Sequence, residues 1–289
     1  MQKVKGPALT PPAPARIWVL LASEASTAVV FRRGPSRWTR LYLWDTRTDT
    51  FIPGSWFTGR LYELLSDLSP DGLHLVYLAR NESKRRQERA EAELGVDNFW
   101  AWTAVCHPPR VKAIGLWNAN DGFSGGGIFA DNGTLWLHHD FKLSDKMVSL
   151  RQPPNLRVVL SPQGSRQVIW LEAMKRTGWR VSQMPQTGNW ETFKPPLVLQ
   201  KKKLELRVLG RRMRLAGFLQ EYVWHGPQPQ PGLQGASWAD IDRQGRLVYA
   251  REGRLYAATP EGEQELANLN DDQPPGRPAE SPEEGTLHR

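Results

Sequence analysis

Residues 68–78 read Leu-Ser-Pro-Asp-Gly-Leu-His-Leu-Val-Tyr-Leu, a polar turn that ends in glycine and leads into an apolar strand. Proline presets φ, aspartate hydrogen-bonds its own backbone, and glycine supplies the positive φ that closes such a turn. The same pattern recurs at 129–133, 160–164 and 241–245. The strands predicted after the four turns are 73–78, 134–138, 168–171 and 246–250. This repeat predicts a chain built from antiparallel hairpins.

More strands are predicted beside these hairpins, at 27–31, 40–44, 50–52, 178–183 and 254–258. Four strands per unit, repeated along the chain, is typical of a β-propeller. At about 40–45 residues per blade, residues 16–269 accommodate five or six blades. We therefore expect one all-β domain, a β-propeller of five to six four-stranded blades, with a two-sheet β-sandwich as the alternative. The apolar run 17–21 is expected to pair with the last blade and close the ring.

The turn at 68–72 resembles the repeat of WD40-like and TolB-type propellers, and Leu43-Trp44-Asp45-Thr46 resembles the Trp-Asp end of a WD40 third strand. The resemblance covers about a third of the chain, in short pieces. The Gly-His pair that usually opens a WD40 repeat is absent. The resemblance implies a propeller, a fold that commonly serves as a platform for partners.

Composition and charge describe the remainder of the chain. The 289 residues carry a net charge of +8, in proportions that exclude collagen and integral membrane proteins. The proline-rich start 1–15 and the acidic, proline-rich end 270–289 are predicted to be disordered. The run 17–21 is too short to span a bilayer, so no membrane association is predicted. One cysteine, Cys106, excludes an internal disulfide framework, and we expect a cytoplasmic monomer.

One charged segment interrupts the predicted strands. Residues 81–95 combine helix-forming, mostly charged residues with Asn81 as a helix N-cap and Gly95 as a C-cap. They offer almost no apolar face, which predicts a solvated insertion whose removal leaves stability nearly unchanged. The alternative is that the insertion contacts a partner, because loops on a rigid scaffold carry recognition.

Several motifs of known catalytic classes are absent from the sequence. It contains no His-Glu-x-x-His, no Walker loop and no Gly-x-Gly-x-x-Gly. The glycines at 122–127 are not followed by the Lys-Ser/Thr pair that would meet a phosphate and its magnesium, and they indicate close backbone packing. Adjacent ligand pairs such as Cys106-His107 point to opposite faces of a strand, so a metal would need single ligands from different blades, such as His107 and His139. We predict no metal and no cofactor.

Aromatic and charged residues supply the candidate binding residues. Trp100 and Trp102 share one face of a predicted strand, so they either fill the space between blades or form a stacking platform. Tryptophan is seldom fully buried, and 13 tryptophans are expected to leave some at a surface. The candidate binding residues are Arg60, Glu63, Trp100, Trp102, His107 and Trp238.

The basic run 201–214 alternates with apolar residues over 203–208, which predicts a half-buried strand that turns near Gly210. Its charges then form a solvated strand face that discourages edge pairing. An anion-facing patch is the alternative. Nucleic acid is not favoured as a partner, because no nucleic-acid-binding module accompanies the run.

Two functions follow from these predictions. The first is a non-catalytic scaffold that holds a protein partner through one face of the disc. The second is a propeller hydrolase or lyase that acts on a small or carbohydrate substrate at the axial funnel, with Glu63, Asp67 and Asp240 as acid/base candidates. The second requires two of these carboxylates to converge in an open funnel beside Trp102 or Trp238. A protein partner is expected, with a small-molecule ligand as the alternative.

Overall fold

The computed structural model describes residues 13–34, 37–95, 99–119, 125–138, 149–161, 166–189, 192–212, 217–227 and 232–275. Strands dominate these ranges, and the two helices within them are α1 (Lys84–Leu94) and α2 (Arg166–Arg176). The predicted all-β class is therefore confirmed. No helix in the described ranges is long and apolar enough to cross a membrane.

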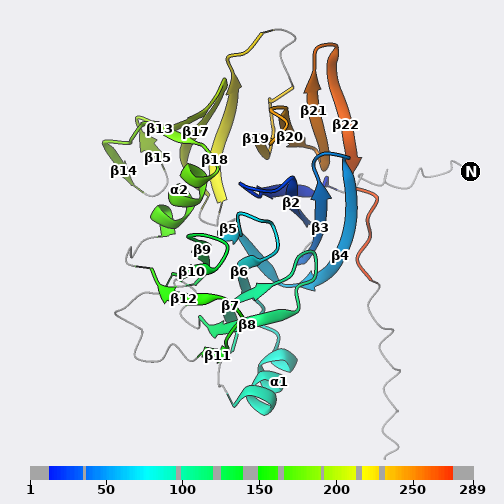
Figure 1. Cartoon of the computed structure of the whole chain (residues 1–289), viewed down its shortest axis with the longest axis vertical. Helices are drawn as coiled ribbons and strands as arrows, with labels where there is room; N and C mark the ends of the chain where they lie inside the picture. The colour runs from blue at the N-terminus through cyan, green and yellow to red at the C-terminus, as the bar shows by residue number, and fades with distance from the viewer. Residues whose placement is uncertain are drawn as a thin grey trace, which may run out of the picture.

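Three sheets contain four consecutive strands of the chain as neighbours (Figure 1). Sheet A contains β1 (Arg16–Leu21), β2 (Thr27–Arg33), β3 (Trp38–Asp45) and β4 (Thr50–Thr58). Sheet B contains β5 (Arg60–Leu68), β6 (Leu75–Arg80), β7 (Ala101–Cys106) and β8 (Ala113–Asn118), with β11 (Ser149–Arg151) added at its edge. Sheet F contains β19 (Trp238–Ile241), β20 (Leu247–Arg251), β21 (Arg254–Thr259) and β22 (Gly262–Asn268).

The other sheets are less regular. Sheet C contains β9 (Gly127–Phe129), β10 (Thr134–Leu137) and β12 (Arg157–Leu160), and its β10–β12 pair is parallel. Sheet D contains β13 (Arg180–Gln183), β16 (Leu197–Lys201), β17 (Leu204–Arg212) and β18 (Gly217–Trp224). A small hairpin pairs β14 (Thr187–Asn189) with β15 (Thr192–Lys194). This number of sheets rules out the two-sheet β-sandwich, and none of the described sheets closes on itself.

Strands β1, β5, β18 and β19 meet helix α2 along a common line that we call the central column. One internal space of about 40 Å³ is lined from all five elements, by side chains that include Trp18, Glu63, Met174, Tyr222 and Trp238. Sheets A, B and F present their first strand to the column, whereas sheet D presents its last strand, β18.

Apolar clusters join neighbouring sheets around this column, because each sheet buries side chains on the face that meets the next sheet. One cluster joins sheets A and B, another joins A and F, a third joins B and C, and a fourth joins D and F together with α2. Helix α2 also contacts β9 of sheet C and β13 of sheet D. Strands β6 and β7 are covered on both faces and are almost entirely apolar for this reason.

The glycines predicted to pack closely do so where the structure describes them. Gly126 has a φ of 81°, and a Cβ there would lie 2.1 Å from the Leu65 carbonyl oxygen. Only glycine allows this approach, which places β9 against β5. Residues 120–124 lie outside the described ranges.

Two predictions about individual strands need correction. Residues 168–171 belong to helix α2 and not to a strand, because a short apolar run does not reveal its period. Strand β17 runs on to Arg212 and is irregular near Gly210, where a turn was predicted. The apolar side of the predicted alternation over 203–208 is confirmed, since Leu204, Leu206 and Val208 are fully buried, but Glu205 on the other face is also only 7% exposed.

The predicted pairing of 17–21 with the last blade is wrong. Strand β1 pairs only with β2, because sheet A is a complete meander without a contribution from the end of the chain. The two ends of the described chain are joined by side chains instead. Arg32 donates hydrogen bonds to the carbonyls of Leu269 (3.0 Å) and Asp272 (2.9 Å), and Arg40 forms a 2.5 Å ion pair with Asp272. Of the segments predicted to be disordered, 1–12 and 276–289 lie outside the described residues.

A buried ion pair fixes α2 to the centre of the molecule. Arg176 Nη2 and Nη1 lie 2.5 and 2.8 Å from the two carboxylate oxygens of Asp67, which is 3% exposed. The Phe129 amide donates to the same carboxylate at 2.8 Å, and Arg176 also donates to the Leu68 carbonyl at 2.9 Å. Burial raises the pKa of Asp67, and Arg176 and the Phe129 amide oppose that shift. The pair therefore joins β5, β9 and α2.

We expect Arg176→Met to lower the free energy of unfolding by about 3–5 kcal/mol, because it leaves the buried Asp67 carboxylate without its cation. Adding Asp67→Asn should recover part of this loss. Denaturant titration of the full chain measures both effects. Lys175→Met is the matched control, since Lys175 pairs with Glu172 at an exposed position of the same helix. An Arg176→Met variant as stable as this control would contradict a structural role for the pair.

Candidate functional site

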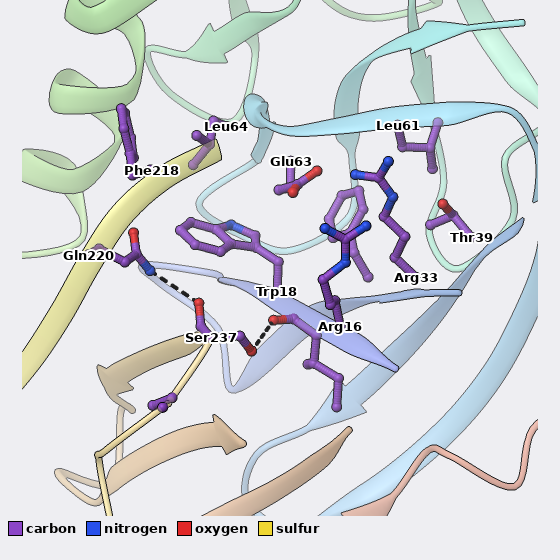
Figure 2. A pocket seen from close by; sticks show the side chains of 14 residues that line it. Arg16, Trp18, Arg33, Thr39, Leu61, Glu63, Leu64, Phe218, Gln220 and Ser237 are labelled. Atoms are coloured by element: carbon purple, nitrogen blue, oxygen red, sulfur yellow. Dashed lines mark hydrogen bonds between the residues drawn. The ribbon is translucent and has the colours of Figure 1, made fainter. Parts of the chain in front are cut away.

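One end of the central column opens into a cavity of about 280 Å³, which we call the arginine pocket (Figure 2). Its charged and polar lining residues include Arg16, Arg33, Glu63 and Gln220. Arg16 and Trp18 are two residues apart on β1, so both side chains point to the same face of the strand. Strands β2, β3, β5 and β18 and the segment before β19 complete the lining.

The hairpin register places two positive charges side by side in this pocket. Arg16 and Arg33 are directly opposed across the β1–β2 pair. Like charges in this position destabilise a sheet. Figure 2 shows both guanidinium groups on the same side of the hairpin as Glu63, which comes from β5. The pocket thus holds two arginines at a cross-strand position where like charges repel, together with Glu63.

The ionisable groups of the arginine pocket are shifted by burial. Burial raises the pKa of Glu63, and its own amide and the charges of Arg33, Arg60 and Arg16 only partly offset that shift. Burial also lowers the pKa of Arg33, although Glu63 opposes this shift. In the described part of the chain, the Arg33 guanidinium forms no hydrogen bond or ion pair. Glu63 and Arg33 therefore attract each other electrostatically but do not form an ion pair.

The opposite end of the column is formed by four turns, which we call the turn ring: residues 22–27, 69–74, 130–134 and 242–246. A main-chain hydrogen bond of 2.8–3.0 Å closes each turn, from Ala22 to Thr27, Ser69 to His74, Ala130 to Thr134 and Asp242 to Arg246. Three of the four turns predicted from the sequence are thereby confirmed. The fourth, at 160–164, lies mostly outside the described residues.

Hydrogen bonds also connect one turn of the ring to the next. The Glu24 amide donates to the Pro70 carbonyl at 2.8 Å, and the Asp71 amide donates to the Asn132 side chain at 2.8 Å. Asn132 in turn donates to the Glu24 carboxylate at 3.0 Å. Arg243 donates to the Ser23 carbonyl. The turn ring is therefore a cross-linked surface and not a set of independent loops.

The carboxylates considered for acid/base chemistry do converge, but in a space that is filled. Glu63, Asp67 and Asp240 all line the 40 Å³ internal space beside Trp238. A space of this size holds about one water molecule. Asp240 accepts from Lys201 at 2.6 Å and from the Trp179 indole at 3.2 Å, and Asp67 is held by Arg176. Helix α2 occupies the rest of the column, so this geometry does not support a hydrolase or lyase at that point.

The other candidate binding residues lie apart from one another. Trp102 is 3% exposed and stacks on Phe99, with ring centroids 5.3 Å apart, so it fills the core and forms no platform with Trp100. Trp100 is half-buried beneath the guanidinium of Arg80, and Trp238 is 4% exposed. His107 is exposed and its ring lies 4.9 Å from that of His74. Only Glu63 lines the arginine pocket, and Arg60 acts on it electrostatically.

Helix α1 packs more closely than its sequence predicts. The N-cap is Ser83 and not the predicted Asn81. The predicted C-cap is confirmed, since Gly95 ends the helix with a φ of 64°. The Arg86 guanidinium lies 3.9 Å above the Trp102 ring, and Ala90 is 6% exposed within the same apolar cluster. Removal of the insertion would therefore expose Trp102, and we now expect it to destabilise the protein.

Two basic side chains of the run 201–214 form ion pairs within the protein. Lys201 pairs with Asp240, and Arg207 pairs with Glu205 at 2.5 Å. No group of three or more His, Cys, Asp and Glu side chains that could hold a metal occurs among the described residues. His139, considered above as a ligand, lies outside them.

The sequence predictions missed the two arginines that define the pocket. A signal for them was present, because the β1–β2 turn is short and its register follows from the turn. Counting outward from Ala22 and Thr27 places position 16 opposite position 33. Two arginines at opposed positions would then have been recognised as a destabilising pair and as candidates for a functional role.

Comparison with known proteins adds no assignment, since no family model, curated protein or solved structure matches the chain.

We expect Arg86→Ala to cost about 1–2 kcal/mol of stability, because the guanidinium covers the buried Trp102 ring. Arg89→Ala is the control on the same helix: Arg89 is 74% exposed, and its pair with Glu93 contributes about 0–1 kcal/mol. Chemical denaturation of both variants gives the comparison. Equal losses would show that α1 is an independent surface insertion.

Glu63→Gln should raise the melting temperature at neutral pH. The pKa of Glu63 is raised in the folded protein, so its ionised form opposes folding at every pH above its unfolded value of about 4.3. The advantage of glutamine should therefore be absent below about pH 4, grow as pH rises from there to the folded pKa, and stay constant above it. Thermal melts of both proteins across this range measure it. A gain that is independent of pH would contradict the assignment.

Proposed function

We propose that this chain is a non-catalytic scaffold with a β-propeller-like architecture that holds a protein partner on the turn ring. The fold part of the proposal is supported by the apolar clusters that link F to A, A to B, B to C and D to F. Helix α2 bridges C and D, so neighbouring sheets surround the central column. On this reading sheets A, B, C, D and F are five blades, of which D presents its last strand to the centre.

The cross-linked turn ring is the observation that carries the functional proposal. Binding residues commonly lie on loops that a rigid scaffold positions. Here the hydrogen bonds of Glu24, Asp71 and Asn132 fix three turns against one another. A surface already ordered in this way loses little conformational entropy when a partner binds.

The turn ring also presents an apolar contact among polar groups. Leu73 is 60% exposed, the largest exposed fraction among the described large apolar residues. Its amide donates to the Asp71 carboxylate at 3.0 Å, and the Asp71 amide donates to Asn132 of the neighbouring turn, so polar groups adjoin it on the ring. An apolar anchor with a polar rim is the usual composition of a protein–protein contact. The free and buried Cys106 fits a cytoplasmic setting for this interaction.

Leu73→Glu should abolish recovery of a stoichiometric partner when the full chain is used as bait in a lysate of its source organism. We expect a loss of at least about ten-fold, because a charge replaces the apolar anchor. Met184→Glu is the control, since Met184 is 57% exposed and follows β13 at its end away from the ring. Equal recovery with both variants, or no stoichiometric partner with the parent chain, would contradict the proposal. Melting curves confirm that both variants are folded.

A further inference from the structure

The arginine pocket holds opposite charges that are close enough to interact and too far apart to pair. The charge of Glu63 favours the ionised form of Arg33, and the charge of Arg33 favours the ionised form of Glu63. No ion pair joins the two groups in the described part of the chain. Each group is also partly removed from water. Both groups are therefore available to a ligand while already carrying part of the desolvation cost of binding.

The arrangement discriminates between classes of small ligand. A plain anion at Arg33 would meet the carboxylate of Glu63, and a plain cation at Glu63 would meet the guanidinium groups of Arg33 and Arg16. A ligand that carries both charges satisfies both sides of the pocket. Charge-assisted hydrogen bonds of this kind are about twice as strong as neutral ones.

The remaining lining of the pocket is apolar and aromatic. Its apolar members include Trp18, Phe31, Leu61, Leu64 and Phe218, and its neutral polar side chains are those of Thr39, Gln220 and Ser237. Figure 2 shows the Trp18 indole and the Phe218 ring on the Gln220 side of Glu63, away from Arg33. The charged groups and much of the apolar wall thus occupy different sides of one cavity.

The size of the cavity limits the ligand. Pockets for drug-sized molecules begin at about 300 Å³, and the arginine pocket measures about 280 Å³. The cavity therefore suits a molecule smaller than a drug, with two opposite charges close together and an apolar group beside them. A free amino acid has this composition.

We propose that the arginine pocket binds a free α-amino acid with an apolar side chain. Its carboxylate lies at Arg33 and Arg16, its ammonium group lies at Glu63, and its side chain packs against Trp18 and Phe218. This site lies at the other end of the central column from the turn ring, and it does not depend on a partner bound there.

Calorimetric titration of the full chain with three matched probes tests the proposal. L-leucine carries both charges, 4-methylpentanoate has the same carbon chain without the ammonium group, and 3-methylbutylamine lacks the carboxylate. We expect saturable binding of L-leucine and affinities at least about ten-fold weaker for each of the other two. Absence of L-leucine binding up to about 10 mM would overturn the proposal. Equal binding of 4-methylpentanoate would also overturn it and identify a plain anion site.

Two variants assign the charges within the pocket. Glu63→Gln should weaken the binding of L-leucine by about ten-fold and leave the binding of 4-methylpentanoate unchanged or tighter. Arg33→Met should weaken the binding of both ligands. Glu265→Gln and Arg254→Met are matched controls from an exposed ion pair on sheet F. L-leucine affinity unchanged in either pocket variant would place the ligand elsewhere. The three-probe comparison on the parent chain decides the proposal even if a pocket variant does not fold.

Discussion

The ion pair between Asp67 and Arg176 joins parts of the chain that lie 109 residues apart, and the centre of the molecule depends on it. Asp67 comes from the inner strand of sheet B, and Arg176 comes from the last turn of α2. A carboxylate at 3% exposure persists only when it is paired and hydrogen-bonded, and here a guanidinium and the Phe129 amide supply both. Because α2 is held in this way, it fills the column that the inner strands would otherwise leave open. The structure thus uses a buried charge pair, together with the apolar packing of Trp170, to position α2.

A second constraint is the common direction of the inner strands. Strands β1, β5 and β19 each run from the arginine pocket to the turn ring, so their first residues gather at one end and their turns at the other. Turn residues satisfy their polar groups with one another, since neighbouring turns offer both donors and acceptors. At the other end, the Arg33 guanidinium has no hydrogen-bond or ion-pair partner among the described residues. The two ends of one column therefore differ in chemistry for a topological reason.

The hairpins were predictable from sequence because their signals are local. Proline, aspartate and glycine at fixed positions identify the turns at 68–72, 129–133 and 241–245, and Gly95 identifies the end of α1. Helix α2 was not predictable, because its apolar residues 168–171 form a continuous run that shows no helical period. Burial of Trp102 was missed for a similar reason: the residue that covers it, Arg86, belongs to a segment whose sequence shows almost no apolar face. Glu63 is the one candidate binding residue that lines the pocket. Arg16 and Arg33 were not among the candidates, because their opposition is visible only once the register of the two strands is known.

Charge pairing provides the physical basis for separating the two ends by role. On and around the turn ring, Arg176, Lys201 and Arg246 each have a carboxylate partner and Arg243 donates to the Ser23 carbonyl, so these cations are engaged within the protein and recognition falls to shape and to an apolar anchor. In the arginine pocket the balance is incomplete, because Arg33 has no partner in the described chain and Glu63 accepts a hydrogen bond only from its own amide. Balanced surfaces suit large partners, for which desolvating unpaired charges over a wide area would be costly. An incompletely paired, half-enclosed site suits a small ligand that brings the missing charges with it, since only a few groups then have to be desolvated.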